Sequence, residues 1–186
     1  DLFRTQGLGG FADLMVAVSK DPAMSLWLDS VSNNAAYTST PNENYARELF
    51  ELFTLGVGHY TENDIKEAAR ALTGIKINPE TGQQVFLPRQ HDYGLKTIFD
   101  KTGDFDAEDV VDLVMQQPAC AEHVAKRLWT FFAYENPEPE VVTALAKTLR
   151  DNKYELKPVL REMFLADAFY DRRATFTHIK SPAELM

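Results

Sequence analysis

The stretch NENYARELFELFTLG, residues 42–56, decides the fold class of this chain. Its large apolar residues recur at intervals of three and four, as they do on the buried face of an α-helix. They are Tyr45, Leu49, Leu52 and Phe53. Gly56 follows the last of them, where a residue in the left-handed conformation commonly ends a helix. We therefore predict a helix over residues 42–55.

The same spacing recurs on both sides of this stretch, usually after a capping residue or a proline. It predicts helices over residues 8–18, 22–28, 65–73, 107–115, 118–132, 141–149 and 159–164. Residues 29–41 and 136–139 lack the spacing and predict a loop and a linker. The fold class is therefore mainly α, a multi-helix bundle.

Residues 75–105 interrupt the helical pattern. Ile75 and Ile77 alternate with polar residues, residues 78–82 are typical of a turn, and residues 85–87 are suited to a returning strand. This predicts one small β-hairpin, followed by an irregular segment over residues 88–105. We thus expect a single helical domain over residues 1–186 with a hairpin and loop insertion at about 75–105.

Composition and charge narrow the possible functions. The 186 residues are 45% hydrophobic and 25% charged, as in ordinary globular proteins. The net charge of -9 repels a polyphosphate backbone and argues against a nucleic-acid partner. No run approaches the ~20 consecutive apolar residues of a membrane span. The first residue is Asp1, and residues 181–186 resemble a helix start, so we expect a fragment of a longer protein.

A first group of candidate residues follows the predicted helix 42–55. Glu48 borders the apolar face, where partial desolvation would suit a general acid or base. Asn44 and Glu51 fall along the same border, and Arg47 diverges from it. Arg70 on the next helix is then an equally suitable cationic partner for Glu48. The simpler alternative is a buried tie between the two helices, formed by Glu48 with Arg70 or with a backbone amide.

A second group lies in the irregular segment. His91 and Asp92 place an imidazole beside a carboxylate, and Lys96 follows shortly after. This combination suits proton transfer, metal binding or the anchoring of an anion by Lys96. Alternatively, His91 and Asp92 staple the loop with local hydrogen bonds.

The metal-binding patterns in the sequence are incomplete. The Glu-x-x-His pairs of dimetal bundles are absent. Asp104, Asp106 and Glu108 have the spacing of a calcium loop, but Asp109 replaces its glycine and Met115 its final glutamate. We therefore predict no metal site and assign no cofactor.

Four motifs together resemble a known family. They are residues 41–56, the sequence AARALTG at 68–74, HDYGLKT at 91–97 and KSP at 180–182. In order and rough spacing they are similar to the bacterial family catalogued as domain of unknown function number 1800. One departure is visible, because the resemblance leads us to expect a glycine shortly after Lys96 and Thr97, where this chain has Asp100. A residue other than glycine tolerates a positive φ poorly.

The resemblance implies a setting and no activity, since the family has none assigned. Its full-length members are longer than this chain, often carry export signals and are often encoded beside a sulfatase-like family. It therefore implies an exported bacterial protein, periplasmic or secreted. A sulfatase-like protein encoded nearby or a cell-envelope component is the partner it suggests.

These observations lead to three hypotheses. The first is a module that binds a partner or ligand in a groove between helix 42–55 and the His91 loop. The binding residues would be Asn44, Arg47, Glu51, Arg70, Asp92 and Lys96. The second is a hydrolase or lyase in which Glu48 or His91 is the general base and Lys96 stabilises developing negative charge. The third is a structural scaffold in which the motifs tie helices to loops.

Overall fold

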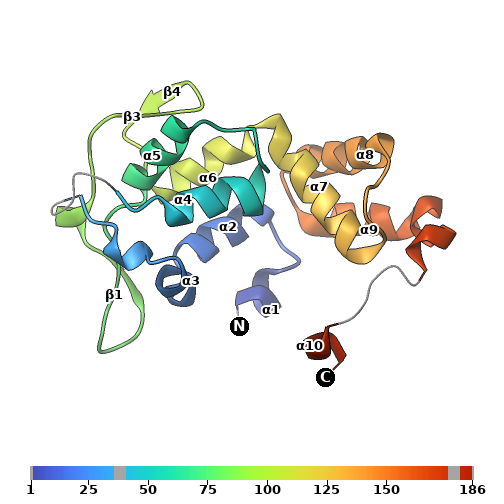
Figure 1. Cartoon of the computed structure of the whole chain (residues 1–186), viewed down its shortest axis with the longest axis horizontal. Helices are drawn as coiled ribbons and strands as arrows, with labels where there is room; N and C mark the ends of the chain where they lie inside the picture. Colours follow the sequence, from blue (N-terminus) through green and yellow to red (C-terminus); the bar gives the residue numbers. More distant parts are fainter. Residues whose placement is uncertain (1, 36–40, 176–180, 186) are drawn as a thin grey trace.

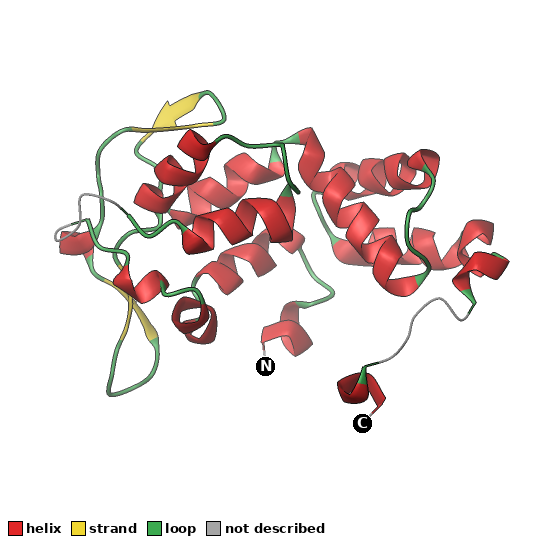
Figure 2. Cartoon of the chain, in the orientation of Figure 1, coloured by secondary structure: helices red, strands yellow, loops and turns green. Residues whose placement is uncertain are grey.

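The computed structural model describes residues 2–35, 41–175 and 181–185, and it is mainly helical (Figure 2). The α-helices are α1 (Leu2–Gln6), α2 (Phe11–Ser19), α3 (Pro22–Trp27), α4 (Asn44–Glu48), α5 (Glu62–Ala71), α6 (Ala107–Met115), α7 (Pro118–Phe132), α8 (Pro139–Asp151), α9 (Leu156–Leu165) and α10 (Pro182–Leu185). Short 3-10 turns are η1 (Ser30–Ser32), η3 (Pro88–Gln90), η4 (Asp167–Tyr170) and η5 (Arg172–Ala174), and η2 (Leu49–Thr54) is a π-helix. The predicted fold class is confirmed.

Side-chain caps start three of these helices where the sequence places them. Asp21 accepts hydrogen bonds from the first turn of α3, with Pro22 at the first helical position. Thr61 and Asp64 cap α5 reciprocally, and Asp106 and Asp109 do the same for α6. Each cap satisfies amide groups that have no partner within the helix. The short α1 lies outside the predicted elements.

The predicted helix 42–55 is present, but its second half is wider than an α-helix. Over η2 the backbone forms a π-helix, and the amide of Leu55 donates to the carbonyl oxygen of Phe50, five residues earlier, at 2.8 Å. The Thr54 hydroxyl donates to Leu49 O at 2.5 Å. His123 of α7 donates from Nε2 to the carbonyl oxygen of Leu52 at 3.0 Å. The wide turn is therefore held by its own threonine and by a side chain from a distant helix.

Two β-hairpins interrupt the helices. The predicted one is confirmed: β1 (Ile75–Ile77) pairs antiparallel with β2 (Gln84–Phe86). The second, β3 (Lys96–Ile98) with β4 (Lys101–Gly103), falls where an irregular segment was expected. Its turn residues Phe99 and Asp100 both have positive φ, 48° and 61°, as a tight hairpin turn requires. That prediction was wrong because the strands are short and no glycine marks the turn.

The largest core cluster joins η2, α5, α6, α7, α8 and α9 through large buried side chains such as Phe50, Ile65 and Trp129. A smaller cluster attaches α2 to α6 through Leu14, Met15, Val18 and Val111. In Figure 1, α2, α4, α5 and α6 lie together on one side, and α7, α8 and α9 on the other. No helix within the described ranges is long and apolar enough to cross a membrane.

The entry to α2 is bonded to the turn before α9. The amide of Phe11 donates to Tyr154 O at 2.9 Å, and the amide of Leu156 donates to Gly9 O at 3.0 Å. Gly10 and Glu155 form an antiparallel bridge between these two bonds. The turn needs positive φ at Lys153 and Tyr154. Segments almost 150 residues apart in sequence are thereby joined by backbone contacts.

The packing of His123 against Gly56 predicts unequal costs for two glycine substitutions. Gly56 has φ +80°, and a Cβ there would lie 2.8 Å from His123 Nδ1. Gly58 has φ +91° with open space around it. Gly56→Ala should lower the free energy of unfolding by about 2 kcal/mol or more, and Gly58→Ala by about 1 kcal/mol. Urea denaturation measures both, and equal losses would contradict the proposed contact.

The turn of the second hairpin predicts a stabilising substitution. At φ 61°, Asp100 occupies a backbone region that costs an L-residue about 1–2 kcal/mol. Glycine avoids this cost, but part of the gain is lost because glycine has more conformational freedom in the unfolded chain. Asp100→Gly should therefore raise the free energy of unfolding by about 0.5 kcal/mol. Lys101→Gly, in the adjacent strand, should instead lower it. A lower urea midpoint for Asp100→Gly would rule out this explanation.

Candidate functional site

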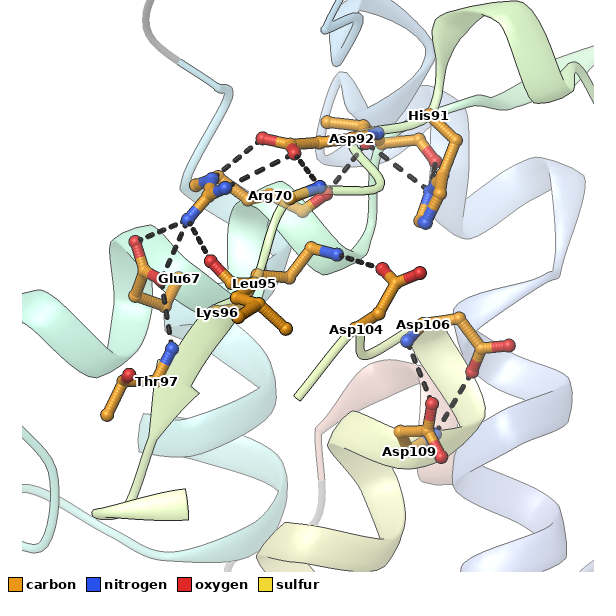
Figure 3. A network of polar contacts seen from close by, with 12 residues as sticks. Glu67, Arg70, His91, Asp92, Leu95, Lys96, Thr97, Asp104, Asp106 and Asp109 are labelled. Atoms are coloured by element: carbon orange, nitrogen blue, oxygen red, sulfur yellow. Dashed lines mark hydrogen bonds and ion pairs between the residues drawn. The ribbon is translucent and has the colours of Figure 1, made fainter. Parts of the chain in front are cut away.

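One face of α5 carries a polar residue on each successive turn, and these residues bind the segment 91–99 in reverse order. We name Asp64, Glu67, Arg70 and Thr73 the polar seam. Their spacing of three places them along one side of the helix and its C-terminal end. Figure 3 shows the part of the seam around Glu67, Arg70 and Asp92.

Arg70 is the centre of the seam. Its Nε donates to Asp92 Oδ2 at 2.7 Å and its Nη2 to Asp92 Oδ1 at 3.2 Å. Its Nη1 bonds both carboxylate oxygens of Glu67, at 3.0 and 2.8 Å, and also Leu95 O at 3.1 Å. A planar guanidinium that binds carboxylates through paired donors is held in one orientation. Arg70 therefore connects α5, the loop after His91 and the start of β3.

The neighbouring seam residues extend the contact in both directions. Glu67 Oε2 accepts from the amide of Thr97 at 3.0 Å, and Asp64 Oδ1 accepts from the amide of Phe99 at 2.8 Å. At the other end, the Thr73 hydroxyl accepts from the amide of Asp92 at 2.8 Å. The seam supplies acceptors to backbone amides that no sheet or helix would satisfy.

His91 is fixed beside Thr73. Its Nδ1 lies 3.0 Å from Thr73 O, and because a carbonyl accepts, this nitrogen carries the proton. The ring is 9% exposed and meets the rings of Phe86 and Tyr93 edge to face, at 5.3 and 4.8 Å between centroids. His91 and Asp92 thus hold the loop mainly through Thr73 and Arg70, 18 to 22 residues earlier in the sequence, and not by local hydrogen bonds alone.

Lys96 is completely buried, and its Nζ lies 3.0 Å from Asp104 Oδ1. A buried ammonium needs such a carboxylate, because the desolvation of an unpaired charge is costly. Hydrogen bonds from Arg70 hold the pKa of Asp92 below its usual value, with smaller contributions from the Gly94 amide and the Lys96 charge. The pKa of Arg70 is correspondingly raised, first by Asp92.

The candidate residues of helix 42–55 form a separate group. Arg47 binds Glu62 through two nitrogens, at 3.0 and 2.8 Å, and reaches Glu43 at 3.3 Å. Glu51 accepts from the Tyr60 hydroxyl at 2.6 Å. Burial and the neighbouring Glu51 raise the pKa of Tyr60 to about 12.

Asn44 and Glu48 take no part in these pairs. Asn44 is exposed, and its amide donates to Asn42 Oδ1 at 2.9 Å. Glu48 is half-buried and forms no hydrogen bond or ion pair in the part of the chain that the structure describes. The expected pairing of Glu48 with Arg70 is absent because Glu67 and Asp92 occupy the guanidinium.

Asn33, which the sequence did not single out, links the helix start to α5. Its side chain accepts from the amide of Asn42 at 3.1 Å and donates to Ala69 O at 2.8 Å. Glu67 was not singled out either, and Asp104 was considered only for its place in a calcium-loop pattern. The three-residue spacing of Glu67 and Arg70 was a readable sign of a shared helix face. Nothing in the sequence marks Asn33, whose partners are distant.

The network has little capacity for chemistry of its own. Its charged groups are bound to one another, and within residues 2–35, 41–175 and 181–185 no group of three His, Cys, Asp or Glu suits a metal ion. A general base needs a reachable proton on a substrate, whereas Asp92 and Glu67 already accept bonds from Arg70. The arrangement is that of an internal tie.

The Arg70 to Asp92 pair predicts a pH-dependent loss of stability. Because its pKa is lower in the folded state, Asp92 stabilises the fold above its unfolded pKa and loses this effect as pH falls through the folded value. Asp92→Asn should cost about 1–3 kcal/mol at pH 7 and less below about pH 4. Urea denaturation at several pH values tests this, with exposed Asp112→Asn as the matched control. Equal effects of the two changes at pH 7 would contradict it.

Comparison with known proteins gives one match. Neither the curated proteins nor the solved structures contain a match to this chain. A family model described as protein of unknown function (DUF1800) matches residues 1–186. It thus covers the four motifs quoted above, including those that form the polar seam and the start of α4. The chain belongs to this family of unknown function.

Proposed function

We propose that this domain is a protein-binding module that accepts an acidic amphipathic helix in an apolar groove. The groove lies along η2, α7 and α9 and has a volume of about 400 Å³. It is lined by Gly7, Leu8, Phe11, Leu52, Phe53, Val124, Arg127, Leu128, Phe131, Phe132, Leu156 and Leu160. All of these except Gly7 and Arg127 have large apolar side chains.

Exposure of this lining is the observation that carries the proposal. Phe131 is 72% exposed, Leu8 57%, Leu52 54% and Phe132 43%. Single exposed apolar residues are ordinary, but several around one groove mark an interaction surface. Their burial by a partner would be favourable in proportion to the apolar area removed from water.

Charge around the groove favours an acidic partner. The three elements η2, α7 and α9 carry four basic side chains, Lys126, Arg127, Lys157 and Arg161, against three acidic ones, Glu51, Glu122 and Glu162. This local excess contrasts with the net charge of -9 for the whole chain.

Burial and the positive charge near the groove lower the pKa of His123, and Arg127 contributes to that charge. Burial lowers the pKa of His123, and the charges of Arg127 and Lys126 lower it further. Arg127 lines the groove and has no ion-pair partner within the described ranges. An acidic side chain beside the apolar face of a bound helix would supply that partner.

The proposal keeps the predicted class of function and changes its location. Leu52 and Phe53 belong to the predicted helix 42–55, so the groove runs along that helix, but the His91 loop does not line it. The mutual pairing of Arg70, Asp92 and Glu67 favours the scaffold hypothesis for those residues. It gives no support to a hydrolase or lyase that uses His91.

The biological setting of the proposal comes from the family. Its members often carry export signals, which supports a periplasmic or secreted protein. A sulfatase-like protein encoded nearby, or a protein of the cell envelope, would then provide the helix.

The groove predicts selective binding of a designed peptide. The probe is a fluorescein-labelled helical peptide of about 18 residues with leucines along one face and glutamates on both flanks. It should bind with a Kd at least ~10-fold lower than that of the same peptide with lysines on the flanks. Fluorescence anisotropy measures both affinities. Phe131→Ala should weaken binding of the acidic peptide about 10-fold or more.

Trp27→Ala is the matched control, since Trp27 is 84% exposed and lies outside the groove lining. It should leave peptide affinity unchanged. Equal affinity for the two peptides would contradict the proposed charge selectivity. Concentration-dependent self-association that is abolished by Phe131→Ala would show instead that a second copy of the chain occupies the groove.

A further inference from the structure

A second hollow, polar and unrelated to the apolar groove, lies beside the N-terminus of α5. It has a volume of about 470 Å³. Its walls are the loop before α5, the turn between β3 and β4, and the junction of α6 with α7. Figure 1 shows the second hairpin passing beside α5. The lining consists of Gly58, His59, Tyr60, Thr61, Asn63, Asp64, Thr97, Phe99, Asp100 and Gln117.

Several polar groups of this lining are accessible to solvent and free of partners within the described residues. The side chains of His59, Asn63 and Asp100 make no hydrogen bond or ion pair with any residue that the structure describes. Gln117 uses its Nε2 to bond Leu113 O at 3.2 Å, and its Oε1 makes no further bond within the same ranges. An imidazole, an amide, a carboxylate and a second amide oxygen are therefore available from four segments of the chain. This differs from the polar seam, where the charged groups bind one another.

Asp64, whose carboxylate accepts three hydrogen bonds, holds the segments around the hollow in place. Asp64 accepts from the amides of Thr61 and Phe99, both at 2.8 Å, and from the Thr61 hydroxyl at 2.7 Å. The carboxylate thereby fixes the start of α5 against the hairpin turn. The adjacent residue, Asp100, is left to present its own carboxylate to the hollow.

Two aromatic rings of the lining pack against the same buried ring. Tyr60 and Phe99 both pack against the buried Phe50, with centroids 5.9 and 5.2 Å away. Phe99 holds φ +48°, which is unusual for a bulky residue, and its amide is bonded to Asp64. The rings are consequently rigid parts of the wall.

The chemistry of the lining selects a class of ligand. Planar amide and carboxylate groups can bond neighbouring hydroxyls, while aromatic faces pack against the C–H groups of a sugar ring. A purely apolar ligand would leave the open polar groups without partners. An anion would meet the carboxylates of Asp64 and Asp100, with one imidazole in the lining to offset them. The volume lies within the usual range for small-molecule sites.

From this combination we propose that the hollow is a binding site for a neutral saccharide. Asn63, Asp100 and Gln117 bond its hydroxyl groups, and Tyr60 and Phe99 pack against its ring. The inference does not depend on the apolar groove, because the two share no lining residue.

Saturation-transfer difference NMR of the protein with cellobiose, maltose and N,N′-diacetylchitobiose, each at millimolar concentration, tests the proposal. At least one of these neutral disaccharides should receive saturation, and its amplification factor should level off as the sugar concentration is raised. Asn63→Ala should reduce the signal about 5-fold or more. Gln83→Ala, an exposed amide on the other hairpin, is the matched control and should change nothing.

Asp100→Gly separates binding from folding. This change removes the carboxylate while relieving the positive φ, so the variant should bind sugar at least about 5-fold more weakly and remain folded. Phe131→Ala should leave sugar binding intact, which distinguishes failure of this site from failure of the groove. Absence of transfer to all three sugars, unchanged binding in both Asn63→Ala and Asp100→Gly, or stronger binding of glucosamine or a sulfated sugar would overturn the proposal.

Discussion

The packing of segment 91–99 against α5 depends on the hydrogen bonds and ion pairs of the Arg70 guanidinium. This group binds Asp92, Glu67 and Leu95 O together, and so joins one helix end to a loop and a strand. The remaining seam residues repeat this on neighbouring turns of α5. The segment 91–99 has few apolar anchors, and its course is set by these polar contacts. Both the second hairpin and one wall of the polar hollow beside α5 follow from that course.

The parts of the fold that the sequence predicts are those stabilised by contacts between residues close in sequence. The caps at Asp21, Thr61 and Asp106 act within a few residues, so their sequence patterns are sufficient to place α3, α5 and α6. The same holds for Gly56, which ends the predicted helix with positive φ. By contrast, the π-helical turn of η2 needs His123, and a residue 71 positions after Leu52 leaves no trace in a local pattern.

The candidate site shows the same division between local and distant contacts. Helical periodicity places Glu48 at the border of the apolar face, and the structure finds it half-buried there. Periodicity cannot show that Arg70 binds Asp92, 22 residues later in the sequence. Among the candidate residues, Arg70 and Asp92 bind each other. Arg47, Glu51, His91 and Lys96 instead bind groups that were not candidates. The groups without partners, such as Asn63 and Asp100, are ordinary in sequence and become notable only because separate segments of the chain bring them to one hollow.

The backbone bonds between Gly9 and Leu156, and between Phe11 and Tyr154, also bear on synthesis of the protein. Contacts between residues so far apart in sequence form late and slow the folding of a chain. While the ribosome is still producing α8, the entry to α2 has no bridge partner, although α2 already has α6 to pack against. The entry to α2 is thus among the last parts of this domain to be fixed in place, and a polypeptide released before residue 154 would lack both bonds that hold it.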